Sequence, residues 1–171
     1  MDGSLTRVDG GYEVRFVRSL THPVDVVWSA LTDPDERSRW FFGGILELAV
    51  GGRVLLDDSD DGITGTVTAI EPPRLLEFTW SSLDAPTSTA RFELGERGED
   101  GCLLTFVHAV DHTARPENLL PGWHCVFDFL PIHLDGGSVT DVPDRFAALK
   151  RHYVATVLRD GEDQSSGDVT R

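Results

Sequence analysis

His108 is the residue with the clearest potential for chemistry. It lies in the run 102–110, where Leu104, Phe106, His108 and Val110 alternate with other residues and therefore share one face of a predicted strand. An imidazole in an apolar pocket can anchor a ligand or exchange a proton near neutral pH. A core histidine bonded to a neighbouring carbonyl or hydroxyl group would produce the same pattern, so both interpretations stay open.

Arg18 is the second candidate, because it interrupts the apolar face of a predicted strand over residues 11–20. The other residues on that face are Tyr12, Val14, Phe16 and Leu20. A guanidinium that points inward needs a carboxylate partner or an anionic ligand. Arg18 is therefore expected either to hold a ligand carboxylate or to form a structural ion pair at the end of the sheet.

The spacing of histidines and acidic residues does not predict a metal site. His108 and His112 would lie about 13 Å apart on a strand, too far to share one ion. The acidic run 57–62 resembles the start of a calcium loop, but Thr68 stands where a bidentate glutamate would be needed. The run is expected to be a solvated turn.

Signatures of catalysis are also missing from the sequence. It contains no glycine-rich phosphate loop and no nucleophile elbow. Cys102 and Cys125 are too few for a disulfide framework and are expected to be buried free thiols. We therefore predict no catalytic residue, no metal and no cofactor, and we favour binding over catalysis.

Short alternating segments separated by turn residues predict an antiparallel sheet. After the strand 11–20, further strands are expected at 44–49, 52–57, 63–70, 74–81, 87–95 and 102–110.

Helices are expected on both sides of these strands. Pro23 fits the first position of one helix, and Asp33 fits the N-cap of a short second helix, with Glu36 placed to reach back to the cap. A long helix over 117–134 has apolar residues nearly all round. A last helix over 142–158 is expected to cover its outer side, where Cys125, Phe129 and Ile132 project.

Several segments resemble the bacterial proteins related to the C-terminal domain of the Hsp90 ATPase activator, within the START and Bet v 1-like superfamily. The matching stretches cover 22–28 (HPVDVVW), 31–34 (LTDP), 40–41 (WF), 50–53 (VGGR), 65–75 (GTVTAIEPPRL), 78–80 (FTW), 104–108 (LTFVH) and 122–124 (GWH). Their order and spacing carry the resemblance, which spans about residues 12–135.

The resemblance implies an α+β helix-grip fold, a curved antiparallel sheet wrapped around a long C-terminal helix. The last helix is similar to an extra helix that some bacterial members carry. The superfamily includes polyketide aromatase/cyclases, and the family name implies a chaperone partner. A fold alone does not decide among these functions.

The bulk composition limits the partners. The formal net charge is −14, which repels nucleic acid and anionic membranes, and no apolar run approaches the roughly 18–20 residues of a membrane span. We expect a flexible leader over 1–10, one domain over 11–159 and a disordered acidic tail over 160–171. Without a signal-peptide pattern, a cytoplasmic location is expected.

The leading hypothesis is a protein that binds a small apolar or aromatic molecule between the sheet and the helix 117–134. A polyketide cyclase-like enzyme and a chaperone partner are the alternatives, and a homodimer is a separate hypothesis about the assembly. The side chains expected at the cavity are Phe16, Arg18, Trp28, Trp40, Phe42, Leu76, Phe78, Trp80, Phe92, Phe106, His108, Trp123 and Phe127.

Overall fold

Eight strands form one antiparallel sheet in the computed structural model, which describes residues 1–57, 62–82, 85–140 and 142–156. The strand order across the sheet is β1-β2-β8-β7-β6-β5-β4-β3. The strands are β1 (Ser4–Val8), β2 (Gly11–Leu20), β3 (Ile45–Leu46), β4 (Arg53–Leu56), β5 (Ile63–Glu71), β6 (Leu75–Ser82), β7 (Ala85–Glu96) and β8 (Cys102–Asp111).

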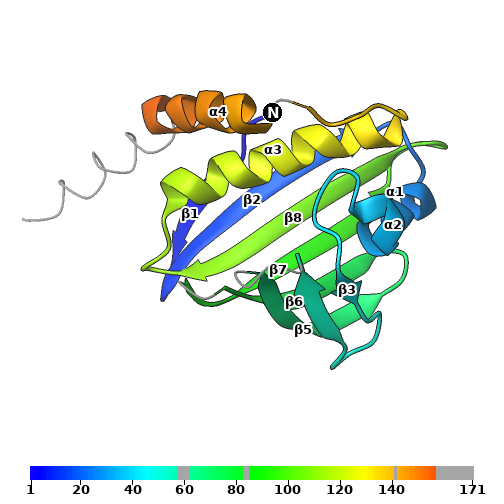
Figure 1. Ribbon diagram of the computed structural model, residues 1–171, viewed down its shortest axis with the longest axis horizontal. Helices are drawn as coiled ribbons and strands as arrows, with labels where there is room; N and C mark the ends of the chain where they lie inside the picture. Colours follow the sequence, from blue (N-terminus) through cyan, green and yellow to red (C-terminus); the bar gives the residue numbers. More distant parts are fainter. Residues whose placement is uncertain (58–61, 83–84, 141, 157–171) are drawn as a thin grey trace, which may run out of the picture.

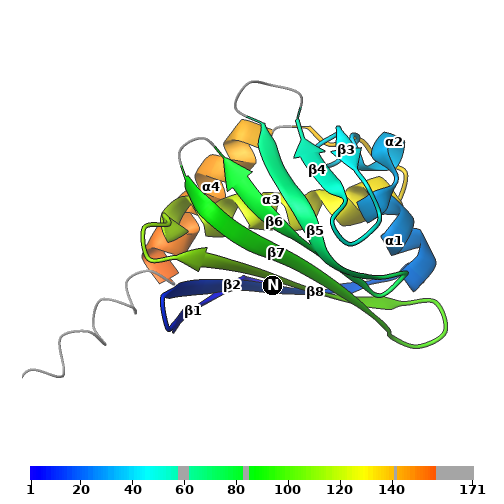
Figure 2. The ribbon, with the colours of Figure 1, turned by 90° about the horizontal axis from the view of Figure 1, so that it is seen from below.

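The helices lie on one side of this sheet (Figures 1 and 2). Helix α3 (Pro116–Leu134) runs along the sheet, and α4 (Val142–Thr156) packs on the outer side of α3 (Figure 1). Helices α1 (Val24–Thr32) and α2 (Pro34–Arg37) lie near the far end of α3. This is the α+β helix-grip fold, with α4 as an additional helix, and it confirms the predicted fold class.

Alternation along the central strands determines which side chains form the core. In β8, Leu104, Phe106 and His108 are buried, whereas Leu103 is exposed. The register places Phe106 between Phe16 of β2 and Phe92 of β7. The period of two in the sequence thus becomes a continuous apolar face under α3.

The expected flexible leader was wrong for its central part, because Ser4–Val8 forms strand β1 and pairs with β2. The two residues between these strands are Asp9 and Gly10, and Gly10 has a φ of 84°. An Asp-Gly pair between two strands is a hairpin signal that the sequence contained.

The expected strand over 44–49 was too long, since β3 includes only Ile45 and Leu46. Gly44 has a φ of 84°, and beyond β3 the chain turns, with Gly52 N–H donating to the Ala49 carbonyl. Gly51 has a φ of 82°, a backbone conformation that glycine adopts at no steric cost in such a turn.

The start of α2 follows the prediction in part. The Asp33 side chain accepts hydrogen bonds from the backbone N–H groups of Asp35 and Glu36, so Asp33 is the N-cap. The predicted return bond from Glu36 was wrong, because its carboxylate instead accepts a hydrogen bond from the Ser29 hydroxyl of α1.

Helix α4 covers less of α3 than the sequence suggested. Cys125 and Phe129 are buried, but Ile132 remains 41% exposed. The two helices run antiparallel, and the start of α4 lies opposite Asp128, to which Arg145 bonds. Ile132 therefore lies one turn beyond the covered stretch. The predicted tail over 160–171 and most of the acidic turn over 57–62 lie outside the described residues.

Candidate ligand-binding site

An apolar cavity of about 690 Å³ lies along the side of α3, which we name the α3 cavity. Its walls come from α3, from the loop between α2 and β3, from strands β5 and β6, and from the start of α4 with the segment before it. The lining residues are Ser38, Arg39, Trp40, Phe41, Phe42, Ile63, Trp80, Asn118, Leu119, Gly122, Trp123, Cys125, Val126, Phe129, Val139, Val142, Pro143 and Phe146.

From the sequence, a cavity was expected beneath α3, between this helix and the sheet. The α3 cavity instead lies beside the helix. The space between sheet and helix is filled by aromatic rings. The ring centroid of Phe106 is 4.1 Å from that of Trp123, 4.7 Å from that of Phe92 and 5.1 Å from that of Phe127. Close packing of this kind leaves no room for a ligand at the centre of the sheet.

The loop that forms one wall is held by Arg37, whose side chain is 2% exposed. Its guanidinium donates hydrogen bonds to the carbonyls of Phe42 and Gly44, both at 2.9 Å, and to that of Thr32 at 3.3 Å. Burial lowers the pKa of Arg37. Sequence reasoning missed this residue, because an arginine on a short polar helix gives no local sign that it will be buried.

Three aromatic rings from different elements meet at the cavity wall. The centroid of Phe41 lies 6.4 Å from that of Trp80 and 5.7 Å from that of Trp123, and the two Trp rings are 5.2 Å apart. Trp40 is fixed nearby, since its Nε1–H donates to the Ala30 carbonyl at 3.0 Å. Such a wall offers ring faces and edges to a flat apolar ligand.

His108 lies at the edge of this aromatic group and is buried. Its Nδ1 accepts a hydrogen bond from Trp123 Nε1–H at 2.9 Å, and its Nε2 is 2.8 Å from the Ser88 hydroxyl. Ser88 donates its own proton to the Trp80 carbonyl, so His108 is the neutral tautomer with its proton on Nε2. Burial lowers the pKa of His108 to about 4, and both ring nitrogens are occupied within the protein.

A second cavity, of about 640 Å³, opens between the end of β8 and the start of α3; we name it the β8–α3 cavity. It shares Trp80, Asn118 and Leu119 with the α3 cavity. Its other lining residues are Ser82, Pro86, Ser88, His108, Val110, Asp111, Thr113, Ala114 and Arg115. In this cavity, hydroxyl, amide and charged groups thus take the place of most of the aromatic rings that line the α3 cavity.

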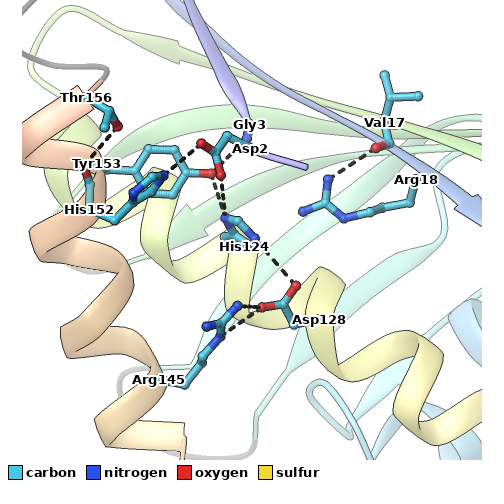
Figure 3. Close-up of polar contacts among 10 residues, drawn as sticks. All are labelled: Asp2, Gly3, Val17, Arg18, His124, Asp128, Arg145, His152, Tyr153 and Thr156. Carbon is cyan, nitrogen blue, oxygen red and sulfur yellow. Dashed lines mark hydrogen bonds and ion pairs between the residues drawn. The ribbon is translucent and has the colours of Figure 1, made fainter.

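A separate polar cluster joins the N-terminus, α3 and α4 (Figure 3). The Tyr153 hydroxyl accepts a hydrogen bond from Gly3 N–H at 2.7 Å and lies 2.8 Å from His124 Nδ1. Burial raises the pKa of Tyr153 to about 12. His124 also contacts Asp128, to which Arg145 bonds. The cluster connects α4 to the rest of the protein and lines neither cavity.

Arg18 points toward the space between β2 and α3 (Figure 3) without forming an ion pair within the described part of the chain. It donates one hydrogen bond to the Val17 carbonyl and lies over the rings of Phe16 and Phe127. Burial lowers the pKa of Arg18, and its Nη2 is buried without a hydrogen-bond partner. The expected structural ion pair is therefore absent here.

The predicted site residues divide into three groups. Trp40, Phe42, Trp80 and Trp123 line the α3 cavity, and His108 and Trp80 line the β8–α3 cavity. Trp28 is half-buried against the core. The remaining predicted residues line neither cavity and belong to the core or lie against it: Phe16, Arg18, Leu76, Phe78, Phe92, Phe106 and Phe127.

Metal-binding groups are not gathered at either cavity. Within residues 1–57, 62–82, 85–140 and 142–156, no three His, Cys, Asp or Glu side chains lie close enough together to hold a metal ion. In the same ranges, no helix is long and apolar enough to cross a membrane.

A sheet that grips a long helix, with an apolar cavity beside that helix, defines a helix-grip protein of the START-like class. Within this class, the family described as Activator of Hsp90 ATPase homolog 1-like protein matches residues 21–135. The chain belongs to this family, as the segments quoted above had indicated. No curated protein has a significantly similar sequence.

Solved structures of similar proteins agree in fold. The crystal structure of CalU16 from Micromonospora echinospora is 28% identical, with a TM-score of 0.72 over 90% of this chain and 94% of that one. DynU16, from the dynemicin biosynthetic locus, is also 28% identical, with a TM-score of 0.66 over 74% of this chain and 48% of that one. The Aha1 dimer from Colwellia psychrerythraea, 18% identical over 71% of this chain and 95% of that one, shares the fold with a TM-score of 0.61.

Proposed function

We propose that the protein binds a small apolar molecule with an aromatic ring system in the α3 cavity. The observation that carries this proposal is the cavity itself, about 690 Å³ in volume, with a wall formed by Phe41, Trp80 and Trp123. Burial of about 200 Å² of apolar ligand surface would contribute about 5 kcal/mol before the loss of ligand freedom is subtracted.

The comparisons support a small organic ligand. DynU16 comes from a biosynthetic locus, and this chain resembles it and CalU16 at 28% identity. This chain is therefore similar to CalU16 and DynU16 in sequence as well as in fold. The match covers 48% of the DynU16 chain.

Binding is favoured over catalysis by the chemistry of the lining. The described residues around the α3 cavity include no Asp, Glu or His. His108, the strongest candidate for acid–base work, has both ring nitrogens engaged and a depressed pKa of about 4. A general acid or base works best with a pKa near the working pH and a free nitrogen facing the substrate.

Gly122 permits a direct test, because it lines the α3 cavity and an added Cβ there would meet no atom within 4 Å. Gly122→Leu should fill the cavity and abolish binding of N-phenyl-1-naphthylamine, measured by its fluorescence. Gly122→Ala is the matched control, since both changes raise helix propensity by up to about 1 kcal/mol but alanine leaves most of the volume free.

The expected result is a stable Gly122→Leu protein that no longer binds the probe, beside a Gly122→Ala protein that binds like wild type. Equal binding by both variants, or no binding by wild type of this probe and a panel of flavonoids and fatty acids, would contradict the proposal.

The partner and location hypotheses remain predictions. A chaperone partner follows from the family description, and a homodimer from the Aha1 structure. Native mass spectrometry of the purified protein tests both the oligomeric state and any co-purified ligand, and fractionation of the source cells tests the expected cytoplasmic location.

A further inference from the structure

The two cavities adjoin each other at the first turn of α3. Trp80, Asn118 and Leu119 line both of them, so each of these side chains separates one space from the other. Asn118 is exposed and Leu119 is half-buried, so the boundary lies near the surface rather than within the packed core. A ligand longer than the α3 cavity would reach the second cavity by passing these two side chains.

The chemistry of the two spaces differs along that path. The α3 cavity is lined mainly by aromatic and aliphatic groups, with Ser38 and Arg39 at its edge, whereas the β8–α3 cavity adds Ser88, Thr113 and Arg115. The lining also includes the Asp111 carboxylate, whose Oδ1 accepts hydrogen bonds from Thr113 N–H at 2.8 Å and from the Thr113 hydroxyl at 2.6 Å. Among the lining residues of this cavity, Arg115 is the charged group that can pair with an acidic ligand group.

Two cations at this junction have no carboxylate partner among the residues that the structure describes. Arg115 lines the β8–α3 cavity and forms no ion pair within the part of the chain that the structure describes. Lys150 of α4 donates a hydrogen bond to the Asn118 side-chain oxygen at 2.8 Å and likewise has no ion pair there. Acidic residues outnumber basic ones by 29 to 15 in this chain, so basic side chains without an ion pair are notable. Such cations can pair with an acidic ligand.

We propose that the natural ligand is an amphipathic organic anion. Its apolar ring system occupies the α3 cavity, and its carboxylate or similar acidic group lies in the β8–α3 cavity beside Arg115, within the field of Lys150. This inference rests on the proposed function, to which it adds the charge and orientation of the ligand. A guanidinium forms paired hydrogen bonds with a carboxylate, and an ammonium adds point charge nearby.

Two probes that differ only in their end group test this inference. 1-Pyrenebutyric acid and 1-pyrenebutanol share a flat ring system and a short chain, but only the acid is charged at pH 7.5. Energy transfer from the Trp80 and Trp123 indoles to pyrene reports binding. The variants are Arg115→Gln and Lys150→Gln, and Arg151→Gln is the control, because Arg151 is an exposed cation next to Lys150 on α4 that lines neither cavity.

Wild type should bind the acid up to about fivefold more tightly than the alcohol, as expected for a partly exposed ion pair. Arg115→Gln should remove most of this preference, Lys150→Gln part of it, and Arg151→Gln none. Affinity for the alcohol should stay unchanged in all three variants, and the preference should shrink in 0.5 M salt.

Each failure has a distinct meaning. Equal binding of the two probes by wild type, or loss of the preference in Arg151→Gln instead of Arg115→Gln, would overturn the anionic ligand while leaving the apolar site in place. Failure of both probes to bind wild type would count against the proposed function itself, and this inference would fall with it.

Discussion

The neutral, buried state of His108 predicts a specific loss of stability in acid. Its pKa is about 4 in the folded protein, against 6.5 for an ordinary histidine. As the pH falls, the unfolded chain therefore takes up the proton first, and the folded state loses stability between pH 6.5 and 4. The difference of about 2.5 between the two pKa values corresponds to about 3 kcal/mol in total, of which about 2 kcal/mol is lost by pH 5.

His108→Gln isolates this contribution from the many acidic groups that also titrate. A glutamine can keep a hydrogen bond with Trp123 or Ser88, so the variant should lose about 1 kcal/mol at pH 7.5. Because glutamine takes up no proton, the stability gap between the two proteins should close or reverse at pH 5. Urea unfolding of both proteins at pH 7.5, 6 and 5 measures this gap.

A stability difference between wild type and His108→Gln of the same size at pH 7.5 and pH 5 would refute the reasoning. It would mean that folding does not lower the pKa of His108. The same variant also bears on catalysis. If a turnover assay becomes available and His108→Gln loses activity about a hundredfold with unchanged affinity, His108 is an acid or base and the protein an enzyme.

Three further predictions concern the elements around the cavity. Arg37→Met should lower the free energy of unfolding by about 3 kcal/mol and weaken probe binding, because it leaves loop carbonyls without their donor. The control Arg39→Met should stay within about 0.5 kcal/mol of the stability of wild type. Equal urea midpoints for the two variants would contradict this prediction. Tyr153→Phe should cost about 1–3 kcal/mol by removing the hydroxyl that bonds Gly3 N–H and His124, and an unchanged melting temperature would show that the cluster contributes nothing. Deleting residues 160–171 should leave the melting temperature nearly unchanged, whereas deleting 142–171 should lower it by baring Cys125 and Phe129; equal effects would mean that α4 does not stabilise the fold.

Much of the fold could be predicted from local patterns. Strand β2 was expected over residues 11–20 and is Gly11–Leu20, and α3 was expected over 117–134 and is Pro116–Leu134. Alternation also placed Phe106 and His108 on the inner face of β8. These features depend on how apolar side chains repeat along a single strand or helix, and this repeat can be read directly from the sequence.

The position of the cavity was decided by tertiary structure. The sequence indicated that Phe92, Phe106 and Phe127 point inward, but it could not indicate that their rings fill the space beneath α3. Whether inward side chains leave a void depends on their volumes and rotamers in three dimensions. The cavity therefore lies beside the helix, between α3, the loop carrying Phe41 and the start of α4.

The polar contacts around the site depend on the tertiary structure in the same way. Arg37 and the Gly3–Tyr153 bond were not foreseen, and Gly3 and Tyr153 lie 150 residues apart in the chain. His108 was recognised as either a ligand anchor or a satisfied core residue, and its partners Trp123 and Ser88 come from other elements. A sequence determines which face of an element a residue occupies, whereas the partner of a polar group is determined only when distant segments pack together.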